Sequence, residues 1–209
     1  MIIQCDFDGT ILTNNMSVLL RQRFAPPIWR DMETDFENGI VPVERSNILQ
    51  YSLVTTAKKD LQSFVHDNIS LRNGFQSFIS FCNSNSISVV IVSSGLDFYI
   101  QTILKAIGLE DIELYCAHTT INGNGIQVGY RDPEGYPVEE DFKNSYARWL
   151  KERDAELIYL GDGLSDIEAA KQAVHVFATG RLPSLLDERV YSYYTFSDFF
   201  DVIDQLKKL

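Results

Sequence analysis

The sequence predicts an α/β fold, a doubly wound, Rossmann-like parallel sheet with a small helical cap inserted after the first strand. Two observations support this prediction. From Gly74 onward, short apolar runs alternate with apolar stripes at helical spacing, which favours a parallel sheet covered by helices. Between Thr13 and Leu71 this alternation stops, and three or four amphipathic segments follow one another without a convincing strand. We therefore expect an α/β core of residues 1–12 and 72–209, and a helical cap of residues 13–71.

Length and composition agree with one such core carrying a modest insertion. The chain has 209 residues, of which 45% are apolar and 12% aromatic, enough for a sizeable core. The three cysteines have no zinc-like spacing, and their odd number excludes a complete set of disulfides. Cys5 and Cys116 lie in apolar runs, so we expect them to be buried thiols.

The first half of the predicted core contains two strands and two helices. Ile2 to Cys5 and Ser88 to Val92 are apolar runs typical of buried strands. Apolar residues recur at helical spacing on either side of the second run, at Phe75, Phe78, Ile79 and Cys82 and then at Ile100, Ile103, Leu104 and Ile107. Gly108 follows the second helical stripe, where a left-handed glycine commonly ends a helix.

The second half continues the alternation. The predicted strands are Leu114 to Ala117, Leu157 to Leu160, Val174 to Ala178 and Val190 to Thr195. The predicted helices contain Phe142, Tyr146, Trp149 and Leu150, and later Phe199 to Leu206. Asn122-Gly123 is a hairpin signal, and Ser165 with Glu168 fits a capping box that starts a further helix.

Polar residues lie where the predicted strands end. Asp6 and Asp8 follow the first strand, Ser93-Ser94-Gly95 follow the second, and Asp162 and Asp166 follow the strand at Leu157. Lys143 opens the helix before that strand. Ligands of doubly wound sheets bind at the carboxyl ends of the strands, so we expect these residues to form one site.

These residue types suit the hydrolysis of a phosphate ester. An Asp carboxylate can attack phosphorus and form an aspartyl-phosphate, and a second carboxyl nearby can act as general acid and base. The negative phosphoryl oxygens require cations, and Mg²⁺ prefers oxygen ligands such as carboxylates and backbone carbonyls. We expect Mg²⁺ as the cofactor, with Asp6, a backbone carbonyl near Asp8, and Asp162 as the protein's share of its ligands.

The pattern resembles the haloacid dehalogenase (HAD) superfamily at all four of its motifs and in their order. They are Asp6-Phe7-Asp8-Gly9-Thr10, Val92-Ser93-Ser94-Gly95, Lys143, and Gly161-Asp162-Gly163-Leu164-Ser165-Asp166. The resemblance implies Asp6 as nucleophile and Asp8 as acid and base. It implies phosphate binding by Thr10, Ser93, Ser94, Gly95 and Lys143. It also implies a metal site of Asp6, Asp8, Asp162 and Asp166.

The position of the cap resembles the phosphoserine-phosphatase-like branch of the superfamily. Phosphoserine phosphatases carry a Glu where this chain has Asn15, and their cap arginine is matched only by Arg45, which is shifted in register. A nearer resemblance is to the 2-hydroxy-3-keto-5-methylthiopentenyl-1-phosphate phosphatases of methionine salvage. It is carried by Phe24-Ala25-Pro26-Pro27-Ile28-Trp29, Ser94-Gly95-Leu96-Asp97-Phe98-Tyr99, Tyr115-Cys116-Ala117-His118 and Asp166-Ile167-Glu168-Ala169-Ala170-Lys171. An apolar, aromatic cap would suit a thioether tail.

The expected partner is a small-molecule phosphate ester. A net charge of −11 speaks against nucleic acid and anionic membranes, since both require basic patches. No apolar stretch approaches a membrane span and no leader is recognisable, so a cytoplasmic location is expected. The sequence leaves open the oligomeric state, and whether Arg45 and His118 contact the substrate.

Two other functions remain open at this stage. The first is a phosphoserine-type phosphatase, or a phosphotransferase that passes the phosphoryl group to an alcohol. The second is a catalytically silent module that binds a metabolite or phosphate on the same fold. Asp8 argues against the silent module, because simple binding does not need a general acid.

Overall fold

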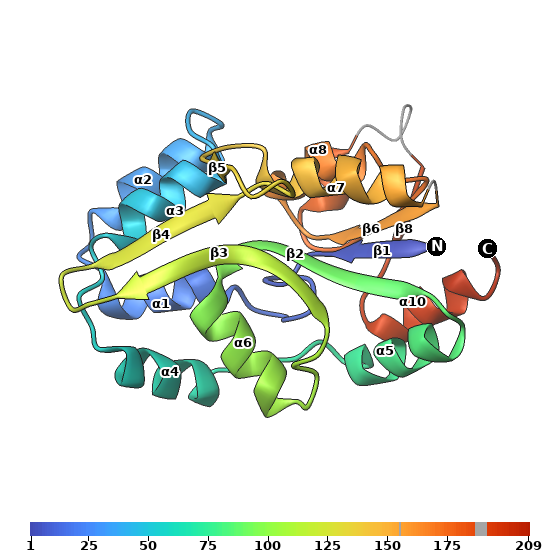
Figure 1. The fold of residues 1–209 in the computed structure, drawn as a ribbon, viewed down its shortest axis with the longest axis horizontal. Helices are drawn as coiled ribbons and strands as arrows, with labels where there is room; N and C mark the ends of the chain where they lie inside the picture. The colour runs from blue at the N-terminus through green and yellow to red at the C-terminus, as the bar shows by residue number, and fades with distance from the viewer. Residues whose placement is uncertain (155, 187–191) are drawn as a thin grey trace.

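A single sheet runs through the computed structural model, which describes residues 1–154, 156–186 and 192–209 (Figure 1). In that part of the chain, eight strands are arranged in the order β5-β4-β3-β2-β1-β6-β7-β8. Their bounds are β1 (Ile2–Cys5), β2 (Ser88–Leu96), β3 (Glu113–Ile121), β4 (Ile126–Arg131), β5 (Pro137–Val138), β6 (Leu157–Gly161), β7 (His175–Ala178) and β8 (Tyr193–Thr195). All neighbouring pairs are parallel except β3–β4 and β4–β5. The predicted doubly wound α/β fold is confirmed.

The strand order determines where a ligand can bind. From β1 the chain builds outward to β2 and β3, and later returns to the other side of β1 as β6, β7 and β8. The carboxyl end of β1 is therefore flanked by those of β2 and β6, which is the switch point where doubly wound sheets bind their ligands.

Helices cover both faces of the sheet (Figure 1). One face carries α5 (Phe75–Ser84), α6 (Asp97–Ala106) and α10 (Phe199–Leu206), and the other carries α7 (Phe142–Arg153) and α8 (Ile167–Ala170). Phe75, Phe78 and Phe199 pack ring against ring between α5 and α10. These contacts explain the helical spacing of the apolar residues in the sequence.

Four helices occupy the segment expected to form the cap. They are α1 (Met16–Phe24), α2 (Trp29–Glu37), α3 (Val43–Tyr51) and α4 (Lys58–Asp67). The two ends of this segment meet at an antiparallel bridge between Leu12 and Leu71. The chain thus leaves the core and returns to it at nearly the same point.

Several predicted elements are longer in the structure. The strand expected to end at Val92 continues to Leu96, and the strand at Leu114 continues to Ile121. The second half of β3 leaves the parallel sheet, because His118 to Ile121 pair antiparallel with β4. The hairpin expected at Asn122-Gly123 joins these two strands.

The structure differs from the prediction at three further points. The prediction of a capping box at Ser165 was wrong, since Ser165 lies inside the 3₁₀ turn η1 (Leu164–Asp166) and its hydroxyl accepts a hydrogen bond from Lys143. A short helix, α9 (Leu182–Leu185), was not expected. The final strand was expected at Val190, but residues 190 and 191 lie outside the described residues and the described strand is Tyr193–Thr195.

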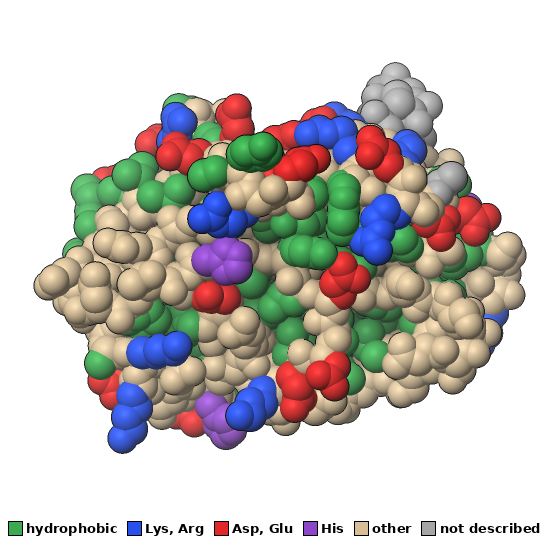
Figure 2. Space-filling model, in the orientation of Figure 1, with side chains coloured by type: hydrophobic (Ala, Val, Ile, Leu, Met, Phe, Trp, Pro, Cys, Tyr) green, Lys and Arg blue, Asp and Glu red, His purple; other side chains and the backbone are tan. Residues whose placement is uncertain are grey.

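The burial of the cysteines confirms the prediction. Cys5 and Cys116 are buried free thiols as expected, and so is Cys82. Figure 2 shows Lys and Arg side chains scattered among Asp and Glu over the face drawn, in a chain with 29 acidic and 18 basic residues. Among the described helices, none has the length and apolarity needed to cross a bilayer.

Candidate active site

The loop after β1 presents Asp6 at the switch point. The Asp6 side chain is 3% exposed, and each of its oxygens accepts one hydrogen bond. Lys143 Nζ donates to Oδ1 at 2.6 Å, and Thr10 Oγ1 donates to Oδ2 at 3.1 Å. The loop folds back at once, because Phe7 O accepts the N–H groups of Ile11 and Leu12. This turn fixes the carboxylate in one orientation.

Arg72 anchors the same loop from the point where the cap segment returns to the core. Its Nε donates to Thr10 O at 2.7 Å, and its Nη2 donates to Gly9 O at 2.5 Å. Its Nη1 donates to Ser197 O at 2.8 Å. The sequence analysis missed this residue, since an isolated arginine beside a loop carries no motif.

Asp8 is held separately from Asp6. Its Oδ1 accepts the N–H of Met16 at 2.7 Å, and its Oδ2 accepts the hydroxyl of Tyr99. Burial raises the pKa of Asp8 above its ordinary value, although both hydrogen bonds oppose the shift. A carboxyl with a raised pKa suits a general acid, because more of it keeps its proton near neutral pH.

The end of β2 supplies hydroxyl and amide groups. Ser93 is 1% exposed, and its hydroxyl accepts the N–H of Gly95 at 3.1 Å. The carbonyl of Ser94 accepts from Asn47 Nδ2 at 2.9 Å and from the Tyr130 hydroxyl at 2.7 Å. Gly95 has no room for a side chain, since a Cβ there would lie 2.1 Å from the Tyr99 hydroxyl.

Lys143 lies in the first turn of α7 and points into the acidic cluster. Its Nζ donates to Asp6 Oδ1 at 2.6 Å, to Asp166 Oδ1 at 2.7 Å and to Ser165 Oγ at 3.1 Å. Burial alone would lower the pKa of Lys143, but Asp166 and Asp6 raise it above its ordinary value. The ammonium therefore stays charged.

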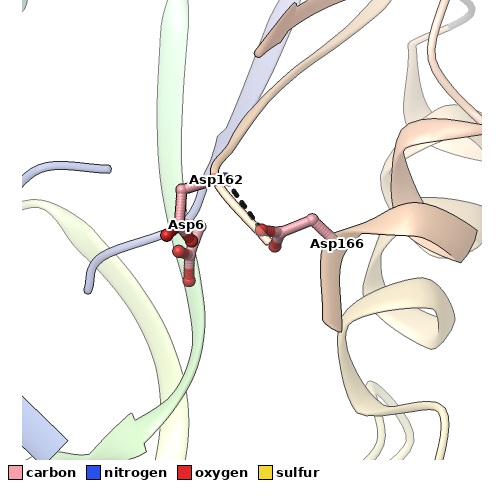
Figure 3. Close-up of side chains that lie close together, drawn as sticks. All are labelled: Asp6, Asp162 and Asp166. Carbon is pink, nitrogen blue, oxygen red and sulfur yellow. Dashed lines mark hydrogen bonds between the residues drawn. The ribbon is translucent and has the colours of Figure 1, made fainter. Parts of the chain in front are cut away.

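Asp162 and Asp166 follow β6 and occupy different places around Asp6. Figure 3 shows the Asp162 carboxylate next to that of Asp6, with Asp166 approaching from the other side. Asp166 is fully buried, and both of its oxygens are used. Oδ2 accepts the N–H groups of Asp162 and Gly163 at 2.9 Å each, while Oδ1 accepts from Lys143 and from the Tyr159 hydroxyl at 2.6 Å.

The three carboxylates form a candidate cation site. Asp6, Asp162 and Asp166 each offer an oxygen, and these oxygens lie within 4.8 Å of one another. Burial, reinforced by the neighbouring carboxylates, raises the pKa of Asp162 to about 8. Burial also raises the pKa of Asp6 to about 7, against the opposing charge of Lys143. Crowded carboxylates with raised pKa values are a favourable place for a hard cation, and an all-oxygen donor set suits Mg²⁺.

A cavity of about 80 Å³ opens above these groups. Of the predicted site residues, those that line it are Asp6, Asp8, Ser93, Ser94, Gly95, Lys143 and Asp162. Thr10 and Asp166 lie behind this layer and contact it through the hydrogen bonds above. The structure thus brings the predicted residues together, with two of them in supporting positions.

The segment of residues 13–71 contributes lining residues that were not predicted from the sequence as site residues. They are Ser17, Arg21, Glu33, Phe36, Val43, Ser46 and Asn47. Arg45, the cap arginine considered from the sequence, is instead exposed and pairs with Glu139 at 3.3 Å. His118 is exposed and lines a different hollow, beside Tyr115 and Arg131.

Comparison with known proteins identifies similar sequences. A family model described as haloacid dehalogenase-like hydrolase matches residues 3–171. A protein of Bacillus mycoides (strain KBAB4), named 2-hydroxy-3-keto-5-methylthiopentenyl-1-phosphate phosphatase, is 30% identical over 209 residues, which cover 98% of this chain and 95% of the relative. A protein of Bacillus cereus (strain G9842) with the same name is 31% identical, with the same coverage.

Solved structures resemble the fold. A phospho-aspartyl intermediate analogue of phosphoserine phosphatase superposes with a TM-score of 0.73 at 16% identity, covering 98% of this chain and 97% of the other. Phosphoserine phosphatase from T. onnurineus in complex with NDSB-201 gives a TM-score of 0.73 at 15% identity, covering 100% of this chain and 94% of the other. At these identities the likeness concerns the fold alone.

Proposed function

The chain belongs to the haloacid dehalogenase-like hydrolases and is a phosphoric monoester hydrolase, and on that premise we propose that it cleaves a small-molecule phosphate ester through an aspartyl-phosphate at Asp6, with Mg²⁺ as cofactor. One observation carries the proposal. The Asp6 carboxylate lines the same cavity as Asp8, a carboxyl whose pKa is raised by burial, and it accepts a hydrogen bond from the cation Lys143.

In the first step, a carboxylate oxygen of Asp6 forms a bond to phosphorus and the bond from phosphorus to the ester oxygen breaks. Asp8 donates its proton to the departing oxygen, so that the product leaves as a neutral alcohol. The Met16 N–H and the Tyr99 hydroxyl hold the Asp8 carboxyl in a position of its own, apart from the carboxylate cluster.

In the second step, Asp8 takes a proton from a water molecule whose oxygen attacks phosphorus. The bond between phosphorus and Asp6 breaks, which releases inorganic phosphate and restores both carboxyl groups. Ser93 and the amide groups beside it would bind the phosphoryl oxygens, while Lys143 would offset their charge; both residues line the cavity.

We assign the direct ligation of Mg²⁺ to Asp6, Asp162 and the backbone carbonyl of Asp8. When bound, the cation would supply positive charge to the phosphoryl oxygens. The four hydrogen bonds of Asp166 favour a positioning role, in which it orients Asp162 through its N–H and holds Lys143 against Asp6. The helices of residues 13–71 would act as the cap that excludes water from the cavity.

The names of the sequence relatives suggest the first ester to test, 2-hydroxy-3-keto-5-methylthiopentenyl 1-phosphate. The phosphoserine-type phosphatase or phosphotransferase remains the enzymatic alternative, and the silent binding module remains the non-enzymatic one. Arg45 gives the phosphoserine alternative no support, because it does not line the cavity.

Phosphate release from a panel of phosphorylated metabolites, measured with Mg²⁺ and with EDTA, tests the proposal. We expect turnover that requires Mg²⁺ and is lost in Asp6→Asn. Asp60→Asn makes the same change at an exposed position of α4 and should keep full activity. Full activity in Asp6→Asn would exclude the covalent mechanism, and no release from any ester would favour the silent module.

A further inference from the structure

The cavity has two chemically different ends. Its core end holds the carboxylates, Ser93 and Lys143, which face the phosphoryl group in the proposed reaction. Its cap end is formed by helices α1, α2 and α3, and there too most lining side chains are polar. Phe36 and Val43 are the apolar side chains among the described residues that line it. The end that must meet the leaving group is therefore hydrophilic.

A buried arginine, Arg21, lies at the cap end. It is 3% exposed, although arginine is almost never buried without partners. Its Nη1 donates to Ser17 Oγ at 2.8 Å and to Asn47 Oδ1 at 3.0 Å, and its Nη2 donates to Glu33 Oε2 at 3.1 Å. Its Nε is buried and has no hydrogen-bond partner among the described residues. The guanidinium thus retains hydrogen-bonding capacity that the protein itself does not use.

The position of Arg21 is fixed relative to the phosphate end. Asn47, which accepts from Arg21, also donates to the Ser94 carbonyl at 2.9 Å and to the Tyr130 hydroxyl at 2.9 Å. The aromatic rings of Trp29 and Tyr51 flank the guanidinium, each with its centroid 5.5 Å from the central carbon. A side chain held this firmly can select ligands by the distance between their phosphate and a second polar group.

The charge balance of the cap end also favours a polar ligand. The one carboxylate that the described structure pairs with Arg21 is Glu33, which is 22% exposed and also accepts from Gln50 Nε2 at 3.0 Å. An apolar group placed against this pair would remove its remaining water without replacing those hydrogen bonds. A site built from hydrogen-bonding groups discriminates strongly against ligands that lack them.

The volume of the cavity points the same way. A volume of about 80 Å³ corresponds to roughly five to eight water molecules at about 10–15 Å³ each. This space accommodates a phosphoryl group and a few further heavy atoms.

We propose that Arg21 determines the substrate specificity of the enzyme. The preferred ester then has a short leaving group, a hydroxylated or carboxylated alcohol of three or four carbons, and an oxygen of this alcohol accepts hydrogen bonds from Arg21. This inference rests on the proposed phosphatase function and narrows its substrate class. It departs from the thioether ester that the relatives' names suggest.

Three esters with the same carbon count test it: glycerol 3-phosphate, which is hydroxylated, 3-phosphoglycerate, which is carboxylated, and propyl phosphate, which is apolar. We expect kcat/KM for at least one oxygen-rich ester to exceed that for propyl phosphate by at least tenfold. The kcat/KM for the methylthiopentenyl ester should also be lower than that for the better oxygen-rich ester. The better of the two oxygen-rich esters identifies which acceptor Arg21 binds.

Variants of Arg21 give the second readout. Arg21→Met should lower kcat/KM for the preferred ester by roughly 10–100-fold, mainly through KM, and leave propyl phosphate within about threefold of wild type. Arg21→Lys should restore part of the loss. Arg23→Met makes the same substitution at an exposed position two residues along α1 and should change neither ester. The ratio of the losses on the two esters separates the contact with the leaving group from any general effect of the substitution.

Each outcome separates the two levels of the proposal. A preference for propyl phosphate or the methylthio ester, or an equal loss on all esters in Arg21→Met, would overturn the role of Arg21 and leave the phosphatase activity standing. No Mg²⁺-dependent release from any ester, propyl phosphate included, would overturn the proposed function itself.

Discussion

Replacing Gly9 by Ala tests how closely the first loop and the cation site are joined. Gly9 has φ = +76°, in the left-handed region that costs an L-residue about 1–2 kcal/mol. A Cβ at this position would also lie 2.1 Å from Asp162 Oδ2, whereas contacts under 3.0 Å are essentially never seen. The Asp162 carboxylate would have to move by about 1 Å, a misplacement that typically lowers activity about 10²-fold.

Gly108→Ala separates these two effects. Gly108 has φ = +70°, and nothing lies within 4 Å of a Cβ built there, so this variant carries the backbone strain without the clash. We expect both variants to lose about 1–2 kcal/mol of unfolding free energy in urea titrations. Only Gly9→Ala should require more Mg²⁺ for half-maximal phosphate release and turn over about 10²-fold more slowly. A wild-type Mg²⁺ titration in Gly9→Ala would refute the placement of Asp162 as a ligand.

Three further predictions concern metal, cap and loop. The pKa values of Asp6 and Asp162 are raised to about 7 and about 8 in the metal-free fold, so protonation of these two carboxylates stabilises the folded state. This contribution to stability is complete below about pH 4 and is lost as the pH rises to 7–8. The melting temperature of the metal-free protein should therefore fall over this range, and Mg²⁺ should raise it more at pH 8 than at pH 5; an equal rise at both would contradict the assignment. Glu44 on α3 is 3% exposed and accepts the N–H of Phe142 at the start of α7. Glu44→Ala should therefore raise KM several-fold and lower the free energy of unfolding by about 1 kcal/mol, whereas Glu44→Gln should stay close to wild type. Arg72→Met removes the hydrogen bonds to the Gly9 and Thr10 carbonyls and should cost about 2–3 kcal/mol and lower kcat; a variant with unchanged kcat would show that the loop keeps its shape unaided.

The core of the protein was largely predictable from the sequence, because its signals are local. The apolar runs at Ile2 and Leu157 are strands in the structure, and the stripe that begins at Phe75 is a helix. Where prediction failed, a longer-range contact decided the outcome. β3 extends to Ile121 because β4 pairs with it, and the Ser165 hydroxyl accepts a hydrogen bond from Lys143 of α7 in place of a helix N–H.

The candidate site divides in the same way. Asp6, Asp8 and Asp162 could be named in advance, since each follows a strand and the ends of parallel strands meet at one edge of the sheet. Their roles remain proposals that the assays above address. Arg21 could not be named in advance, because an arginine on an amphipathic helix is ordinarily exposed, and the same holds for Arg72 in its loop.

The sequence by itself therefore determined the α/β fold and the chemistry offered at the strand ends, since both depend on residues close together in the chain. The tertiary structure alone decided what faces that chemistry. Packing of α1 against α3, and of α3 against β2 and β4, buries Arg21, joins it through Asn47 to the Ser94 carbonyl, and gives the cavity a polar end. Burial and partner choice at such positions depend on contacts between distant segments, which no local pattern encodes.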